Sequence, residues 1–251
     1  MSFLSSLRVA LAFLSRLAPA RAESEGAMAA SLRAYPLAGL CIGLVALIPV
    51  WLGLLPGKPL LLAVIVLGLS VVATRGLHWD GLADLADAWG SGARGERFWQ
   101  VIKDSRAGAF GVMGCCLAML TQAAALAEVV KSGASGVALF GFVLGRFLAV
   151  GLAHLAAHKG RDLVRPGLGR FCLEGARCAG AAHATILAQT LLLGLLLCPA
   201  PVLAWSIALA ALGAWTLLRL ARSRGGLNGD FLGSAVIWGE TAVWLGWSLG
   251  G

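Results

Sequence analysis

Charged residues are scarce in this sequence. Only 13% of its 251 residues are Asp, Glu, Lys or Arg, whereas 59% are hydrophobic. Soluble domains carry roughly 25% charged residues, so the composition excludes a soluble globular protein. The apolar runs are continuous rather than alternating, and they reach the roughly 17–25 residues that cross a bilayer as a helix. The sequence therefore predicts an all-α integral membrane protein with a single polytopic domain, residues 1–251.

Other features are absent too. The six cysteines form no Cys-x-x-Cys pair and most lie inside apolar runs, which favours buried thiols over disulfides or a zinc site. The first apolar run has Arg16 in its middle and no cleavage site, so we expect it to be retained rather than removed as a signal peptide. No internal repeat is evident, which disfavours a transporter built from inverted halves.

The apolar segments set the expected topology. Residues 3–19 are too short and too charged to cross, and they predict an amphipathic helix in the membrane interface. Residues 76–110 are long but polar, so we expect a second interfacial helical segment, broken at Gly90-Ser91-Gly92. About seven transmembrane helices complete the prediction, at residues 35–55, 59–75, 111–130, 135–157, 182–200, 202–221 and 231–249.

Positive charge is concentrated in alternate loops. The formal net charge is +8, and all the Lys and Arg residues except Lys58, Lys131 and Arg146 lie in segments that a seven-span count places on one side. By the positive-inside rule that side is the cytoplasm. We expect a bacterial inner-membrane protein with its N-terminus and active site in the cytoplasm and its C-terminus in the periplasm. Because topology explains the charge, no nucleic-acid partner is expected.

Three aspartates recur at helical spacing in one cytoplasmic segment. Asp80, Asp84 and Asp87 lie at i, i+4 and i+7, so on a helix they fall within roughly 60° of one face. Carboxylates on one helix face repel each other, and the repulsion is stronger beside a low-dielectric membrane. A bound divalent cation usually offsets this repulsion. A solvated acidic face is the alternative, which the apolar residues between the aspartates disfavour.

Three more polar clusters lie in the same set of loops: Lys103-Asp104-Ser105-Arg106, the Arg165-Pro166-Gly167 segment, and the glycine-rich run that ends at Asn228 and Asp230. Carboxylates for Mg²⁺ or Mn²⁺, cations for anionic oxygens and glycines for close backbone approach are the components of phosphoryl transfer. Asp84 and His78 are both candidates for the catalytic base. We expect metal ligands at Asp80, Asp84, Asp87 and Asp104, and phosphate or substrate contacts at Lys103, Ser105, Arg106, Arg165, Asn228 and Asp230.

The sequence resembles the cobalamin synthase family, the adenosylcobinamide-GDP ribazoletransferases. Three positions depart from the family's common residues: Trp79, Leu85 and Asn228. None of them removes a carboxylate. The resemblance rests on six blocks in the family's order: Ala12-Phe13-Leu14-Ser15-Arg16, Tyr35-Pro36-Leu37-Ala38-Gly39, Gly76-Leu77-His78-Trp79-Asp80-Gly81-Leu82-Ala83-Asp84, Lys103-Asp104-Ser105-Arg106-Ala107-Gly108-Ala109-Phe110-Gly111, Arg165-Pro166-Gly167-Leu168-Gly169 and Gly225-Gly226-Leu227-Asn228-Gly229-Asp230.

The resemblance implies a Mg²⁺-dependent membrane enzyme of cobalamin nucleotide-loop assembly. Such an enzyme joins α-ribazole, or its 5′-phosphate, to adenosylcobinamide-GDP and gives adenosylcobalamin, or its phosphate, with release of GMP. The ribazole 5′-hydroxyl is expected to attack the phosphorus next to cobinamide. The sequence leaves open the lower-ligand base, the number of metal ions, the oligomeric state, and association with other enzymes of this assembly.

Two rival functions are consistent with parts of the pattern. CDP-alcohol phosphotransferases have a motif that ends Gly-x3-Asp-x3-Asp, and Gly76, Asp80 and Asp84 match that ending. A lipid head-group enzyme of that kind is the alternative reading. A cation transporter would place acidic residues near the middle of the membrane, where only Glu128 and Glu240 are candidates.

Overall fold

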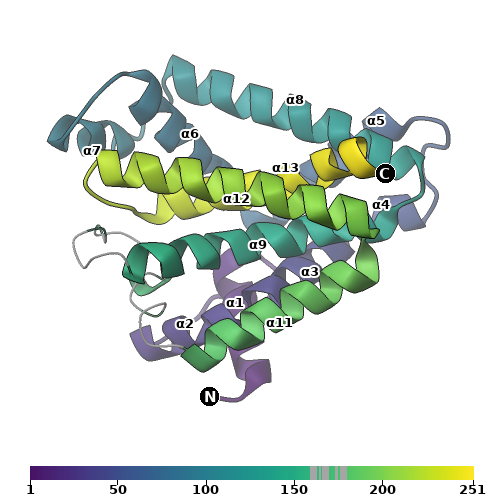
Figure 1. Ribbon diagram of the computed structural model, residues 1–251, viewed down its shortest axis with the longest axis horizontal. Coiled ribbons are helices and arrows are strands. Elements are labelled where there is room, and N and C mark those ends of the chain that lie inside the picture. The colour runs from purple at the N-terminus through teal and green to yellow at the C-terminus, as the bar shows by residue number, and fades with distance from the viewer. Residues whose placement is uncertain (159–162, 164, 166–169, 173–174, 176–179) are drawn as a thin grey trace.

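The computed structural model describes residues 1–158, 163, 165, 170–172, 175 and 180–251 as a bundle of helices, without a sheet in these parts (Figure 1). Residues 166–169 of the predicted Arg165 motif lie outside this description. The helices are α1 (Phe3–Leu14), α2 (Glu25–Ser31), η1 (Leu32–Ala34), α3 (Tyr35–Ala46), α4 (Ile48–Trp51), α5 (Pro59–Thr74), α6 (Leu77–Gly90), α7 (Glu96–Ile102), α8 (Ala109–Lys131), α9 (Ser135–His158), α11 (Gly180–Leu197), α12 (Ala200–Ser223) and α13 (Gly229–Gly250).

Proline and left-handed residues determine where several helices begin and end. Pro36, Pro49 and Pro59 each lie in the first turn of a helix, where the missing N–H is not needed. The predicted span 35–55 is therefore interrupted, because α3 ends at Ala46 and α4 begins at Ile48. Arg75 (φ 58°) and Gly76 (φ 69°) are both left-handed, and α6 leaves α5 at an angle of 94°.

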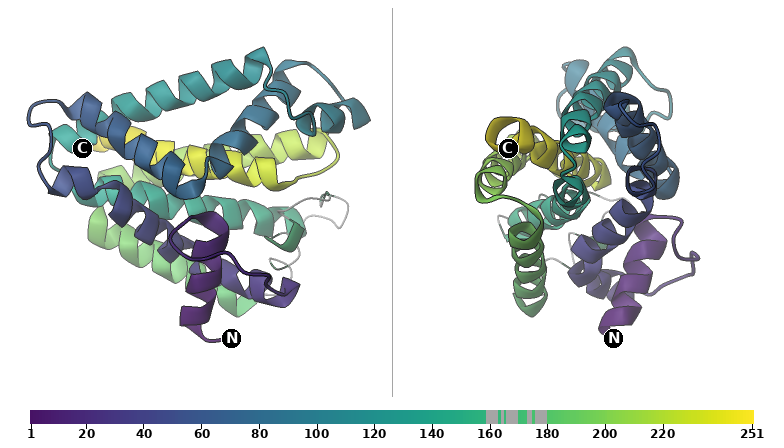
Figure 2. Two further views of the ribbon diagram at one scale, coloured as in Figure 1. Left: turned by 180° about the vertical axis from the view of Figure 1, so that it is seen from behind. Right: turned by 90° about the vertical axis from the view of Figure 1, so that its right-hand side faces the viewer.

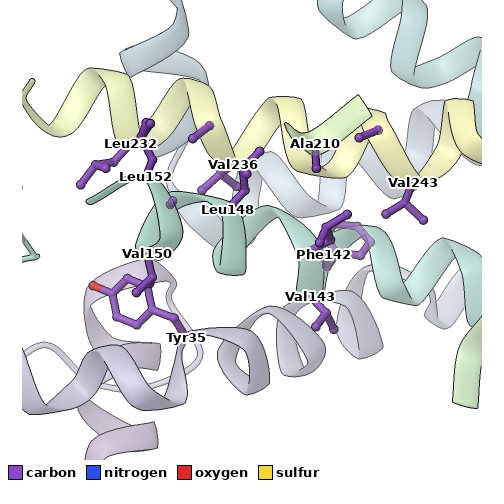
Figure 3. Packing of buried hydrophobic residues seen from close by; sticks show 14 of the residues in the cluster. Tyr35, Phe142, Val143, Leu148, Val150, Leu152, Ala210, Leu232, Val236 and Val243 are labelled. Atoms are coloured by element: carbon purple, nitrogen blue, oxygen red, sulfur yellow. The ribbon is translucent and has the colours of Figure 1, made fainter. Parts of the chain in front are cut away.

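Helices α9 and α13 form the centre of the bundle (Figure 3). Phe142 on α9 packs edge-to-face against Trp244 on α13, and both side chains are fully buried. Arg146 and Glu240, also buried, form a hydrogen-bonded ion pair between the same two helices. Since a charge left alone in an apolar core is costly, each residue requires the other. The pair ties the two central helices together.

Among the residues that the structure describes, four helical segments are long and apolar enough to cross a membrane, and the bent pair α5–α6 gives a fifth if it counts as one crossing. The all-α membrane class is therefore confirmed, whereas the predicted count of about seven spans is not. We treat α6 as lying outside the spanning segments because of its 94° bend. The four segments are Glu25–Ala46, Ala109–Lys131, Ser135–Ala157 and Ala200–Ser223.

The predicted motifs gather at one end of the bundle. Helices α6 and α7 and the connection from α12 to α13 lie at the same end, and the C-terminus lies at the other (Figure 1). Helix α1 runs crosswise to the long helices (Figure 2). This is the orientation that an interfacial helix requires.

Candidate active site

A cavity of about 550 Å³ opens among α1, α3, α6, α7, α9 and α13. Its walls include side chains from segments that lie far apart in the sequence, so the fold collects them. Six of the residues that the sequence predicted as functional line it: His78, Asp80, Lys103, Arg165, Asn228 and Asp230.

Helix α6 brings Asp80 and Asp84 next to the first turn of α13. The contact depends on Gly81, because a Cβ atom at this position would lie 2.9 Å from the Cα of Asp230. The Ser234 hydroxyl also donates to the carbonyl oxygen of Gly81 at 3.4 Å. Asp230 therefore joins the acidic residues of α6, although the sequence assigned it to substrate contacts instead.

The carboxylates of this group raise one another's proton affinity. The pKa of Asp84 is raised to about 6, first by burial and then by the charges of Asp230, Asp80 and Asp87. Burial also raises the pKa of Asp230, with Asp80 adding to the shift, while a hydrogen bond from Asn228 (Nδ2 to Oδ2, 2.6 Å) opposes it. The raised pKa values show that the protein stabilises the ionised form of these carboxylates poorly. A bound cation would reduce the repulsion between them.

Asp87 has a different environment from its neighbours. Its two carboxylate oxygens accept hydrogen bonds from the backbone nitrogens of Gly108 and Gly111, both at 2.7 Å. These nitrogens belong to the first turn of α8, where N–H groups lack partners within the helix. Asp87 thus caps α8, and its charge is favourable at a helix N-terminus. Helical spacing alone gave no signal for this role.

Lys103 lines the cavity, but its neighbours Asp104, Ser105 and Arg106 do not. Asp104 accepts two hydrogen bonds from the Arg106 guanidinium, at 3.0 and 2.8 Å, and this partner lowers the pKa of Asp104 to about 2. Ser105 and Arg106 are exposed. Asp104 is not among the residues that line the cavity, and the charges that raise the pKa of Asp84 are those of Asp230, Asp80 and Asp87.

Lys103 and Arg165 supply positive charge at the cavity. Arg165 is fixed in place: its Nε donates to the Gly225 carbonyl at 3.0 Å, and its guanidinium lies over the Trp99 ring at 5.0 Å. Its backbone nitrogen donates to the Leu227 carbonyl at 3.0 Å. Lys103 is exposed beside the cavity. Both cations therefore line the same cavity as the carboxylates of Asp80 and Asp230.

His78 is almost completely buried, with 5% of its surface exposed, and its Nε2 has no hydrogen-bond partner among the described residues. Burial lowers the pKa of His78 well below its ordinary value, and the Arg146 charge lowers it further. The imidazole is neutral near pH 7 and is a weaker base than an exposed histidine.

The donor set has the chemistry of a Mg²⁺ site. Asp80, Asp84 and Asp230 offer hard carboxylate oxygens, the ligand type that Mg²⁺ and Mn²⁺ prefer, and their mutual repulsion is relieved by a divalent cation. Within the described part of the chain, no three His, Cys, Asp or Glu side chains are already grouped closely enough to hold a metal ion. Metal ligation by these residues stays a prediction.

The fold and the site together define a polytopic α-helical membrane protein with an ionic candidate active site at one end of its bundle. Over residues 6–248 the sequence matches the model of the family described as cobalamin-5-phosphate synthase. The chain belongs to this family.

Curated relatives carry a matching description. The chain is 46% identical over 245 residues to the adenosylcobinamide-GDP ribazoletransferase of Nitratidesulfovibrio vulgaris strain Miyazaki F, covering 96% of this chain and 94% of the relative. It is 37% identical over 259 residues to the protein of that description from Pseudomonas putida strain F1, covering 100% and 97%. No solved structure matches the chain. In both comparisons the likeness covers at least 94% of each sequence.

Proposed function

We propose that this protein joins adenosylcobinamide-GDP to α-ribazole, or to its 5′-phosphate, and releases GMP. The relatives' description names this transfer, and the likeness covers almost all of both chains. The observation that carries the proposal is that six of the residues predicted for phosphoryl transfer line one cavity. The CDP-alcohol alternative is not favoured, because the family and its relatives share the cobalamin description.

The proposed chemistry divides between anionic and cationic groups. Asp80, Asp84 and Asp230 would hold Mg²⁺, or Mn²⁺, which when bound supplies charge stabilisation to the oxygens of the pyrophosphate. Lys103 and Arg165 bind and orient the phosphates from the other side and offset the charge that develops as GMP leaves.

The attacking hydroxyl must lose its proton. Asp84 and His78 are the two candidates for this step. His78 is buried with a lowered pKa and is a weak base, and the pKa of about 6 at Asp84 belongs to the metal-free carboxyl, so Asp84 acts as the base only where it does not also ligate the metal. The family description names a 5-phosphate product. When that phosphate is present the 5-position of the ribose is occupied, so a different ribose hydroxyl, and not the expected 5′-hydroxyl, attacks the phosphorus.

We also propose the orientation that positive charge predicts. The N-terminus and the candidate site face the cytoplasm, the C-terminus faces the periplasm, and α5, α11 and α13 cross the membrane together with the four longer segments. The gathering of the motifs at one end of the bundle supports this arrangement (Figure 1). A homo-oligomer, or association with other enzymes of nucleotide-loop assembly, stays a prediction.

Membranes that contain this protein test the proposed reaction. Supplied with adenosylcobinamide-GDP and α-ribazole, they should form a cobalamin product and GMP in equal amounts. A parallel sample receives CDP-diacylglycerol and an alcohol acceptor. Turnover in the second sample alone would replace the proposed function with the lipid head-group alternative.

A further inference from the structure

The cavity of about 550 Å³ is lined by side chains of two chemical kinds. Asp80, Lys103, Arg165 and Asp230 are charged. Four others, which we call the floor, are mostly apolar: Tyr35, Val150, Leu232 and Val236. Each of these four side chains is at most 8% exposed. Figure 3 shows Val150 beside the Tyr35 ring on one side of α9, and Leu232 and Val236 along α13.

The polar groups beside the floor are few and electrically neutral. Arg146, 1% exposed, is neutralised by Glu240, and its Nε has no hydrogen-bond partner among the described residues. His78 lines the same cavity and has an unpartnered Nε2. Both residues line the cavity, although these two atoms are themselves covered. The floor therefore suits a neutral, mostly apolar group with one or two polar atoms.

The two substrates of the proposed reaction differ in how well they match this description. The donor carries a corrin ring, which is far larger than the ligands that cavities of ~300–1,000 Å³ enclose. Its guanine has several hydrogen-bonding atoms on its edge, which apolar walls would leave unpaired. The acceptor, α-ribazole, is a nucleoside of an apolar bicyclic aromatic base with one unsubstituted ring nitrogen. Only the acceptor base matches the floor.

A second cavity, of about 760 Å³, also has Asp80 in its wall. The two cavities share Phe13, Leu77 and Asp80 in their walls, and the second one adds Arg21 and Arg75. The Asp80 side chain therefore lines both cavities. This is the arrangement that a reaction between two separately bound substrates requires.

We propose that the floor is the binding site for the base of the acceptor nucleoside. With the base between Tyr35, Val150 and α13, the ribose extends towards Asp80 and Asp230. The ring nitrogen of the base takes a hydrogen bond from Arg146 or His78. This inference rests on the proposed function and assigns one of its two substrates to named residues.

Val150 offers a test because it lines the floor without carrying charge. Val150→Phe fills the floor, whereas Val150→Ala enlarges it without overpacking the core. Val143→Ala is the matched control: this buried valine lies seven residues earlier on α9 and does not line the cavity. The measurements are the Kd of α-ribazole in detergent, followed by the fluorescence of its base, and the KM of each substrate.

We expect Val150→Phe to raise the Kd and the KM of α-ribazole by about tenfold or more, and Val150→Ala to raise them severalfold. The donor KM should change less than about twofold, and Val143→Ala should behave as wild type. A higher KM for the donor alone would place guanine in the floor and overturn the inference. Acceptor binding that is absent, or that is unchanged in both Val150 variants, would overturn it too. Acceptor binding that responds to Val150 without any GMP release would instead contradict the proposed function.

Discussion

Gly81 on α6 lies directly against the backbone of Asp230 on α13. A Cβ atom at Gly81 would lie 2.9 Å from the Asp230 Cα and 3.2 Å from its carbonyl oxygen. Real side chains do not tolerate the shorter distance without a shift of the backbone. This contact is what places Asp230 next to Asp80 and Asp84, and several expectations about the site depend on it.

Gly81→Ala should separate α6 from α13. Overpacking of this kind costs ~1–3 kcal/mol, and the displaced Asp230 should lower the rate of transfer as well as the melting temperature. Gly68→Ala on α5 is the control, because a Cβ atom there meets nothing within 4 Å. Helix propensity predicts that Gly68→Ala is neutral or slightly stabilising. Equal behaviour of the two variants would show that the Gly81 contact is not needed.

Asp87→Asn should act on stability more than on metal dependence. The amide keeps one acceptor oxygen for the first turn of α8 but loses the charge and the second acceptor, which should cost on the order of 1 kcal/mol. The melting temperature should therefore fall while the Mg²⁺ concentration for half-maximal activity is unchanged. A raised Mg²⁺ requirement in a variant of normal stability would instead support the ligand role that the spacing of the aspartates predicts.

The pH dependence of metal binding should follow Asp84. Its folded-state pKa of about 6 lies above the ordinary value of about 4, so the folded, metal-free protein holds this proton more tightly than the unfolded chain. The contribution of Asp84 to the stability of the metal-free protein is therefore greatest below pH ~4 and is lost as the pH rises through ~6.

Mg²⁺ has the opposite preference, because it requires the ionised carboxylate. Its affinity should weaken by about tenfold for each pH unit below ~6. Calorimetric titration at pH 5 and pH 7 measures both affinities, and Asp84→Asn should remove most of the difference. A difference of the same size in Asp84→Asn would assign the proton to another group, such as Asp230.

Arg165→Ala should weaken binding of the donor. The loss of a charge-assisted contact to phosphate costs ~1.5–3 kcal/mol, which corresponds to a donor KM raised by roughly ten- to a hundredfold. Arg222→Ala, which removes an exposed arginine near the end of α12 that does not line the cavity, is the control and should leave the donor KM unchanged. An equal donor KM in both variants would show that Arg165 does not bind the donor and that its segment only connects two helices.

The sequence predicted the helical class and six of the polar residues that line the cavity because both depend on local signals. Apolar runs reveal helices, and unusual polar clusters such as Lys103 with its neighbours reveal functional loops. The role of Asp87 could not be predicted, since it depends on where Gly108 and Gly111 lie in space. The pairing of Arg146 with Glu240 is hidden for the same reason, because 94 positions separate the two residues.

The span count shows a different limit. Length and apolarity describe a segment but not its geometry, so the predicted span 35–55 did not reveal the break after Ala46, and the bend at Arg75 and Gly76 did not emerge from hydropathy. A reporter fused after Gly251 tests the orientation directly. We expect the reporter to lie in the periplasm. A reporter that lies in the cytoplasm would require a number of membrane crossings other than seven.

The most direct test of the central claim is the Mg²⁺ dependence of transfer in wild type and in Asp84→Asn. The substitution keeps the shape of the side chain and removes its charge, so we expect the kcat to fall by on the order of a hundredfold or more. The metal-free variant should melt at the same or a higher temperature than wild type, because the repulsion with Asp230 and Asp80 is relieved. Normal turnover of Asp84→Asn at the same Mg²⁺ concentration would contradict a metal site built on this carboxylate.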